Sequence, residues 1–429
     1  MHIIIKRMRQ TRGLMCAALL GVSLSAATAA SATEEVKFSS WWDAGKWLKF
    51  VEGMETSVEG LGLDVDVQIG GVAFPQFLQQ TTLASLSGNQ PDYWLALAGW
   101  VPTLVEAGAV MPLDNLLSKE FLDKLGPESL DAVTVNGKLY AVPIAPGPIT
   151  LQYNPRLLKK AGYNAPPTTW DELTEQIMAV CKLETNSGQK VFGIGLRTDR
   201  IANSGQWSIP IVYGMGGDVV DADGNPDLSS AGVRAAMEWV RDITDAGCAN
   251  PGVNLNQTRA LMAEGRAGFI FEGPWGLGLM DTLTEGKVEA GPDGDFWIAP
   301  MPADANGKVR TIANDHVLMV SSVTKNPELV AKILTHMASN QEFVDSSFEA
   351  LGILITSNQE LITSGIMGDD AFTQVGVEAL PTANANPIKH PKWAAMMAEL
   401  AISLQKVMAG TDIDAELIDL DRRVTRVLK

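Results

Sequence analysis

Short runs of apolar residues alternate along most of the chain with longer stretches in which apolar side chains recur every three or four residues. The short runs predict strands, and the longer stretches predict amphipathic helices. Strands are expected at 36–42, at 63–69 and within "YWLALAG", and the first two are each followed by a helix. Strands that alternate with helices in this way predict an α/β architecture with parallel strands.

A proline-rich segment, "NGKLYAVPIAPGPITLQYN", interrupts this alternation. Pro146 and Pro148 have no N–H to donate within a sheet, so we expect the chain to cross between two domains here. Further strands are expected in "VFGIGL", "AGFIFEGPWGLGLM" and "NDHVLMVSS". The helix "AGVRAAMEWVRDITDAG" is expected to end at Gly247, because glycine accepts the left-handed conformation. The segment 197–208, rich in Asn, Ser and Gly, is expected to be a loop.

The length and composition are those of a globular protein with about two domains: 429 residues, 46% hydrophobic and 19% charged. The net charge of −17 argues against nucleic acid or an anionic membrane as a partner. At the N-terminus, basic residues, an apolar stretch and the small residues of "ATAASATEE" predict a signal peptide at 1–32. We therefore expect an exported protein located in the periplasm.

Two cysteines, Cys181 and Cys248, remain after this predicted signal peptide is removed. An oxidising compartment favours a disulfide between them. The alternative is two separate buried thiols that behave as small apolar residues.

Four stretches resemble one family, and they occur in that family's order and spacing. They are "PDYWLALAGWVPTLVEAGAVMPLDNLL", "GKLYAVPIAPGPITLQYNPRLLKKAGYNAPPTTWDEL", "GRAGFIFEGPWGLG" and "TKNPELVAKILTHMAS". On these residues the chain resembles the extracellular solute-binding proteins of ABC importers, in their maltodextrin-binding-like, carbohydrate-oriented class. The resemblance covers essentially the whole mature chain.

The resemblance implies a two-lobed periplasmic binding protein fold, in which two α/β domains are joined by a hinge that the chain crosses more than once. One lobe would comprise 33–146 and 315–362, and the other 147–314 and 363–429. The ligand would lie in the cleft between the lobes, which close over it. The implied partners are a mono- or oligosaccharide and the membrane permease, and the protein is expected to be a monomer without a cofactor.

Aromatic residues at strand ends are candidates for contact with the ligand. Ligands of open α/β sheets bind beyond the carboxyl ends of the strands, and Trp41, Trp42, Gly99 and Trp100 are expected at such ends. Neighbouring residues of a strand point to opposite faces. One of Trp41 and Trp42 is therefore expected to line the cleft and the other to pack behind it.

Loop residues supply the remaining candidates, because a sugar site needs aromatic faces and short polar side chains. The resemblance implies that Trp275 stacks on a sugar ring and that Trp393 occupies a second stacking position. The other candidates are Asp43, Gln206, Trp207, Glu272, Asn314, Asp315 and His316. For each of these seven, the alternative is a solvated loop residue or a hydrogen bond within the hinge.

The chain departs from many maltodextrin binders at two places. It has Gly147 where they carry a glutamate in the crossing segment, and Gly99 with Trp100 where they carry an aspartate–arginine pair. The departure implies a different set of polar contacts to the ligand.

A secreted glycoside-acting enzyme is one alternative class. Glycoside hydrolysis needs two carboxylates that flank a cleft, and Asp43 with Glu272 could form such a pair. Among 50 acidic residues, however, some pair is inevitable. The chain has no GxSxG, HExxH, CxxC or P-loop pattern, and with four His residues a His-rich metal site is not expected.

A binding protein for a charged solute is the second alternative. A sugar phosphate or sulfonate would favour Arg197 and Arg200, which lie near the expected cleft loop. A polyamine would favour Asp43, Glu272 and Asp315 among the aromatic rings. The 11 Trp residues, together with mixed polar side chains, favour a carbohydrate.

Overall fold

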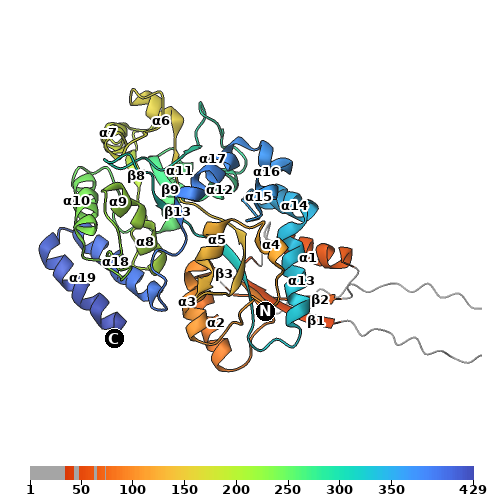
Figure 1. Cartoon of the computed structure of the whole chain (residues 1–429). Coiled ribbons are helices and arrows are strands. Elements are labelled where there is room, and N and C mark those ends of the chain that lie inside the picture. The colour runs from red at the N-terminus through yellow and green to blue at the C-terminus, as the bar shows by residue number, and fades with distance from the viewer. Residues whose placement is uncertain (1–33, 43–47, 62–64, 73) are drawn as a thin grey trace, which may run out of the picture.

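The computed structural model describes residues 34–42, 48–61, 65–72 and 74–429; the predicted signal peptide and Asp43 lie outside them. The described residues form two lobes that lie side by side, each with a sheet of its own (Figure 1). Each sheet contributes to a separate apolar core.

The first lobe is built on a five-stranded sheet in the order β2-β1-β3-β12-β6. Its strands are β1 (Glu34–Ser40), β2 (Val65–Gly71), β3 (Tyr93–Leu97), β6 (Ala141–Ala145) and β12 (His316–Val320). β1 runs parallel to β2 and β3, as the sequence predicts, whereas β12 runs antiparallel to β3 and β6. β3, β6 and β12 are buried throughout, which explains why they are continuous apolar runs in the sequence.

The second lobe is built on a four-stranded sheet in the order β10-β7-β9-β8. Its strands are β7 (Thr150–Tyr153), β8 (Phe192–Gly195), β9 (Ala267–Glu272) and β10 (Trp297–Ala299). β8 and β9 are parallel, and β7 is antiparallel to both β9 and β10. β9 ends at Glu272, so the loop that carries Trp275 begins at the carboxyl end of a central strand.

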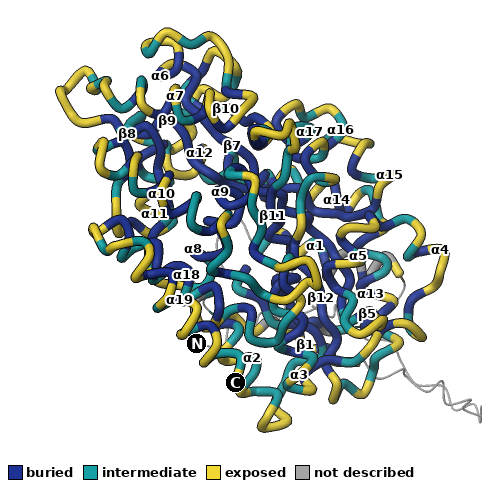
Figure 2. The backbone as a smooth tube through the Cα atoms, turned by 60° about the vertical axis from the view of Figure 1, so that its left-hand side comes forward, coloured by how far each residue is buried: buried dark blue, intermediate teal, exposed yellow. Residues whose placement is uncertain are grey.

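Helices cover both sheets, and the strands at the centre of each lobe are buried while exposed residues lie mainly at the periphery (Figure 2). Around the first sheet lie α1 (Leu48–Gly60), α2 (Phe74–Leu86), η2 (Ala98–Trp100), α3 (Val101–Glu106), α4 (Lys119–Leu122), α5 (Pro127–Ala132), α13 (Pro327–Ser339), α14 (Gln341–Leu351), α15 (Gln359–Ile362) and α16 (Gly365–Asp369), with the small hairpin of β4 (Thr134–Val135) and β5 (Lys138–Leu139). Around the second sheet lie α6 (Pro155–Lys160), α7 (Trp170–Val180), α8 (Ala202–Trp207), α9 (Ile209–Gly214), α10 (Ala231–Asp245), α11 (Leu255–Ala263), α12 (Gly276–Leu283), α17 (Ala371–Ala379), α18 (Trp393–Met408) and α19 (Ile413–Leu428).

Local sequence signals explain where several helices begin and end. α7 begins with a capping box, in which the Thr169 hydroxyl accepts a hydrogen bond from the Glu172 N–H and the Glu172 carboxylate accepts one from the Thr169 N–H. α10 ends at Asp245, and Gly247 has a φ of 72°, as predicted. The segment 197–208 was expected to be a loop, but it contains α8.

The small residues of α8 explain this error. A Cβ atom at Gly205 would overlap the backbone of Met397, so glycine lets the two helices α8 and α18 approach closely. The residues Ser204, Gly205, Gln206 and Trp207 are buried by this packing. Tertiary packing therefore overrides the low helix propensity of the segment.

The two lobes are joined by three chain segments that run side by side. In the proline-rich segment, Pro148 pairs with Ala313, and the Ile149 N–H donates to the Ile312 carbonyl at 2.8 Å. The second segment contains the short strand β11 (Thr311–Ile312). The third segment contains β13 (Ala383–Asn384), which follows η3 (Leu380–Thr382) and pairs in parallel with β11. The expected crossing at the prolines thus lies between β6 of one sheet and β7 of the other. The precise lobe limits stay a prediction.

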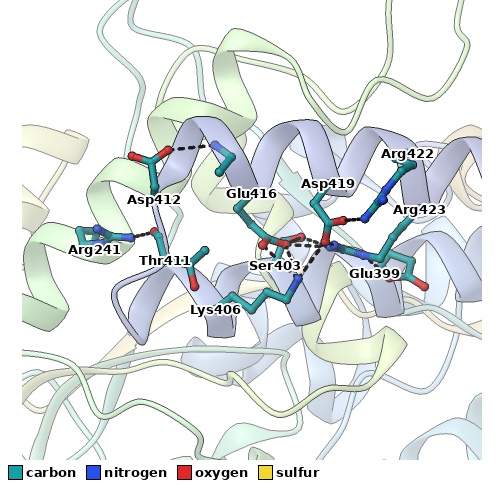
Figure 3. Close-up of polar contacts among 11 residues, drawn as sticks. Arg241, Glu399, Ser403, Lys406, Thr411, Asp412, Glu416, Asp419, Arg422 and Arg423 are labelled. Atoms are coloured by element: carbon teal, nitrogen blue, oxygen red, sulfur yellow. Dashed lines mark hydrogen bonds and ion pairs between the residues drawn. The ribbon is translucent and has the colours of Figure 1, made fainter.

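A network of charges fastens α19 to α18 (Figure 3). The Arg423 guanidinium contacts Glu399 at 2.7 Å and Glu416 at 2.9 Å, and Lys406 contacts Asp419 at 2.9 Å. Burial alone would raise the pKa of Glu416, but hydrogen bonds from Ser403, Arg423 and Lys406 outweigh burial and lower it. The C-terminal helix is therefore an integral part of the second lobe.

Cys181, just after α7, and Cys248, just after α10, form a disulfide with Cα atoms 5.1 Å apart. The bond joins two helices that pack around the second sheet. Within the described part of the chain, every helix is too short or too polar to span a membrane.

Candidate functional site

An aromatic cluster lies at the carboxyl end of β1. The ring of Trp41, which is half-buried, has its centroid 5.6 Å from that of Trp100 and 5.0 Å from that of Phe77. Trp42 is buried, and its ring lies 5.0 Å from Phe50 in the core of the first lobe. Trp42 thus lies in the core and Trp41 nearer the surface, with their ring centroids 6.5 Å apart. Contact of Trp41 with a ligand stays a prediction.

Two tryptophans of the second lobe contact the first lobe or the hinge at glycines. A Cβ atom at Gly147 would lie 2.6 Å from Cζ3 of Trp275, which directly precedes α12. A Cβ atom at Gly99 would lie 3.1 Å from Nε1 of Trp393, which is only 2% exposed. Both distances are too short for ordinary packing. The departures from maltodextrin binders at Gly99 and Gly147 thus coincide with the space that these indoles occupy.

Polar contacts join the lobes beside these indoles. The Thr103 hydroxyl of α3 donates to the Pro391 carbonyl at 2.5 Å. The Lys389 ammonium contacts Asp131 at the end of α5, at 2.6 Å. Both second-lobe groups belong to the segment that leads into α18, so Trp393 is held at the interlobe surface by its neighbours on the chain.

Glu272 is buried beneath Trp275 and is 1% exposed. Its Oε1 atom accepts hydrogen bonds from the Trp275 indole N–H at 2.5 Å and from the Gly273 N–H at 3.1 Å. Its Oε2 atom contacts Nε of Arg259 at 2.6 Å. Each oxygen of the Glu272 carboxylate thus already has a partner within the protein, and contact of Glu272 with a ligand stays a prediction. Sequence reasoning missed Arg259, whose position in α11 gives no sign of a partner 13 residues away on a strand.

His316 lies between aromatic rings of both lobes. Its ring centroid is 5.7 Å from that of Trp41 and 5.8 Å from that of Trp275. Burial lowers the pKa of His316 to about 4, although the Ala145 backbone acts in the opposite direction, so the ring is neutral at neutral pH. Its Nδ1 atom is buried and has no hydrogen-bond partner among the residues that the structure describes.

The two residues before His316 belong to the hinge. The Asn314 N–H donates to the Gly147 carbonyl at 2.8 Å, and the Gly147 N–H donates to Oδ1 of Asp315 at 2.8 Å. Burial raises the pKa of Asp315 to about 6, although the Gly147 N–H acts in the opposite direction. The side-chain oxygen of Asn314 is buried and, within the described ranges, unpaired. Asp315 also borders a hinge cavity of about 90 Å³.

The structure places Gln206 and Trp207 in α8, and both are buried. The Trp207 indole N–H donates to the Phe271 carbonyl at 3.1 Å, and the Arg197 guanidinium lies 5.1 Å from the Trp207 ring. Trp207 is thus part of the second core and not of an open loop. Burial lowers the pKa of Arg197 to about 10, and its Nε donates to Ser204. The Arg197 side chain is buried, and its Nη1 atom has no hydrogen-bond partner among the described residues.

No group of three or more His, Cys, Asp or Glu side chains in the described part of the chain could hold a metal ion. The site has neither an adjacent nucleophile and base nor an open pair of carboxylates among the residues discussed above. Its features are aromatic rings from both lobes, unpaired polar atoms and the ion pair of Arg259 with Glu272. Such a site is suited to holding a ligand reversibly.

The amino-acid sequence matches the family of bacterial extracellular solute-binding proteins over residues 58–342. The chain belongs to this family. The family expected from the sequence is confirmed, and with it a location outside the cytoplasm. The solute-binding protein is 23% identical over 367 residues to the maltotriose-binding protein of Pyrococcus abyssi. The aligned region covers 84% of this chain and 75% of that protein.

Solved structures confirm the two-lobed α/β fold. The solute-binding protein superposes with a TM-score of 0.79, at 20% identity, on an ABC transporter solute-binding protein of Thermotoga lettingae bound with alpha-D-tagatose, covering 92% of this chain and 100% of that one. The GacH receptor of Streptomyces glaucescens, solved in unliganded form and in complex with acarbose, gives the same TM-score and identity and covers 92% and 98%.

Proposed function

We propose that this solute-binding protein captures a neutral mono- or oligosaccharide between its lobes and delivers it to the permease of an ABC importer in the periplasm. The observation that carries the proposal is that tryptophan rings from both lobes approach one residue: the ring centroids of Trp41, from the first lobe, and Trp275, from the second, lie 5.7 and 5.8 Å from that of His316. Flat aromatic faces suit the C–H surfaces of sugar rings. Relatives named for maltotriose, tagatose and acarbose support the same ligand class.

The pairing of charges supports an uncharged ligand. Glu272 is matched by Arg259, and Arg197 lies 3.7 Å from Asp199 and against Trp207. An anionic or cationic solute would need an unmatched counter-charge in the cleft, because a buried charge without a partner is costly. Asp315, a buried carboxylate that accepts the Gly147 N–H, is the group that a cationic solute would use, so a polyamine stays the alternative to the neutral sugar.

Polar atoms beside the rings would hold the sugar hydroxyls. Oδ1 of Asn314 and Nδ1 of His316 are buried and without partners in the described residues. A hydroxyl group can donate to either atom, and such hydrogen bonds would fix the orientation of a ring stacked on Trp275. The protein itself would carry out no covalent step, would need no cofactor and would act as a monomer; closure of the lobes would present the loaded form to the permease.

A thermal-shift screen of residues 33–429 tests the proposal. The panel contains glucose, tagatose, maltose, maltotriose and acarbose, together with glucose 6-phosphate, taurine and spermidine as charged probes. A ligand that binds only the folded state raises the melting temperature by mass action. We expect a shift from at least one neutral sugar, recovered unchanged afterwards. A shift from charged probes alone would contradict the proposal, and a hydrolysed sugar would indicate an enzyme.

A further inference from the structure

The turn that carries Trp275 is fixed at several points. Glu272 closes β9, and its carboxylate accepts the indole N–H of Trp275 at 2.5 Å. The Thr150 hydroxyl donates to the Glu272 carbonyl at 2.9 Å, and the Gln152 amide donates to the Gly273 carbonyl at 2.7 Å. Neighbouring strand β7 therefore holds the backbone of the turn, while Glu272 holds the indole.

Arg259 holds the carboxylate in turn. Its Nε atom lies 2.6 Å from Oε2 of Glu272, and its side chain is 13% exposed. α11, which carries Arg259, packs against β9. A carboxylate buried this deeply is stable only with a partner, because removing one member of a buried ion pair leaves an uncompensated charge. Arg259 thus supplies the positive charge that compensates the buried Glu272 carboxylate.

An ionised acceptor has a direct effect on the indole. Hydrogen bonds to a charged group are shorter and roughly twice as strong as those between neutral groups. The indole of Trp275 has one N–H, and a strong acceptor at that atom restricts rotation of the ring. The orientation of the indole is therefore set by a contact at its edge, through the N–H group, and not by a contact on either face of the ring.

We infer that Arg259 and Glu272 are positioning residues, which hold the Trp275 indole in the orientation at which it meets the sugar. The inference rests on the proposed function, because Trp275 is taken as the stacking residue. It assigns a role to an ion pair that does not itself contact the ligand.

The first experiment reads the indole directly and needs no ligand. In the ¹⁵N-labelled mature protein, the indole N–H resonance of Trp275 is assigned by its loss in Trp275→Phe. We expect this resonance to move in Glu272→Gln and in Arg259→Gln. The matched control is Glu264→Gln, which breaks the surface pair of Glu264 with Arg266 at 3.0 Å and should leave the resonance in place. An unmoved Trp275 resonance in Glu272→Gln would overturn the inference.

The second experiment is a double-mutant cycle measured by calorimetry with maltotriose, or with tagatose if maltotriose produces no thermal shift. Glu272→Gln should weaken binding about tenfold in the wild-type background and leave it unchanged in the Trp275→Ala background. Equal losses in both backgrounds would mean that Glu272 acts on the sugar without Trp275, which would overturn the inference.

A further variant guards against misfolding. Arg259→Met combined with Glu272→Gln removes both charges, so no unpaired charge remains buried, while the amide oxygen can still accept the indole N–H. This double variant should fold and show a shifted Trp275 resonance. An unmoved resonance in it counts against the inference. If no sugar binds the wild-type protein, the proposed function fails, while the resonance experiment still decides whether the pair positions the indole.

Discussion

Replacement of Asp315 by asparagine should make the stability of the protein rise steeply with pH between about pH 4 and 6.5. These limits are the pKa of His316 in the folded protein, about 4, and its ordinary value, 6.5. Asp315 and His316 are adjacent, buried and shifted in opposite senses. Burial raises the pKa of Asp315 from 3.8 to about 6 and lowers that of His316 from 6.5 to about 4. In the wild-type protein, their contributions to the pH dependence of stability should largely offset each other.

The signs follow from proton counting. Between pH 3.8 and about 6 the folded protein keeps a proton on Asp315 that the unfolded chain releases, so this contribution to stability falls as pH rises. Between about pH 4 and 6.5 the unfolded chain keeps a proton on His316 that the folded protein lacks, so that contribution rises with pH. Each shift corresponds to about 3 kcal/mol over its range.

Urea unfolding followed by fluorescence, repeated across this pH range, measures the effect. The stability of Asp315→Asn minus that of the wild type should increase with pH by about 3 kcal/mol, and the same difference for His316→Gln should decrease. Asp304→Asn is the control. The backbone hydrogen bond from Lys308 is the main cause that lowers the pKa of Asp304. The stability of Asp304→Asn minus that of the wild type should therefore decrease with pH, opposite to Asp315→Asn. Flat difference curves for Asp315→Asn and His316→Gln would refute the reasoning.

Three further outcomes are expected. Trp275→Ala should weaken sugar binding at least about 30-fold, the usual effect of removing a buried aromatic anchor. Calorimetry checks this, with Trp297→Ala as the control because the Trp297 ring packs on Phe372. Equal losses of affinity in the two variants would contradict the prediction. Gly147→Ala should lower the free energy of unfolding by about 1–3 kcal/mol through overpacking against Trp275; urea titration would disagree if stability were unchanged. Cys181→Ser should cost about 4 kcal/mol, since the disulfide closes a separation of 67 residues; a wild-type melting temperature would refute this.

Periodicity predicted the larger features of the fold because they follow from local chemistry. The parallel first strands and the left-handed Gly247 each depend on residues close together in the sequence. The family resemblance then supplied the arrangement of the lobes.

Side-chain partners across elements could not be predicted in this way. Glu272 reads as a loop acid open to ligand, but its neighbour Arg259 lies on a different element, and no local pattern indicates that the two meet. Trp207 reads as a loop aromatic, but Gly205 allows its helix to pack tightly on α18 and buries it. Such contacts depend on how helices and strands pack, which a single sequence specifies only through the whole fold.

The three segments between the lobes limit the ways in which the lobes can move. One tether would leave the lobes free to rotate about any axis, whereas hydrogen bonds between neighbouring segments, such as Ile149 N–H to Ile312 and Ala313 N–H to Asn384, tie them into a narrow ribbon. A ribbon bends readily out of its plane and resists shear within it. Opening and closing should therefore follow nearly a single coordinate, so that Trp41 and Trp275 return to the same alignment in each cycle and little rotational entropy is lost when a solute binds.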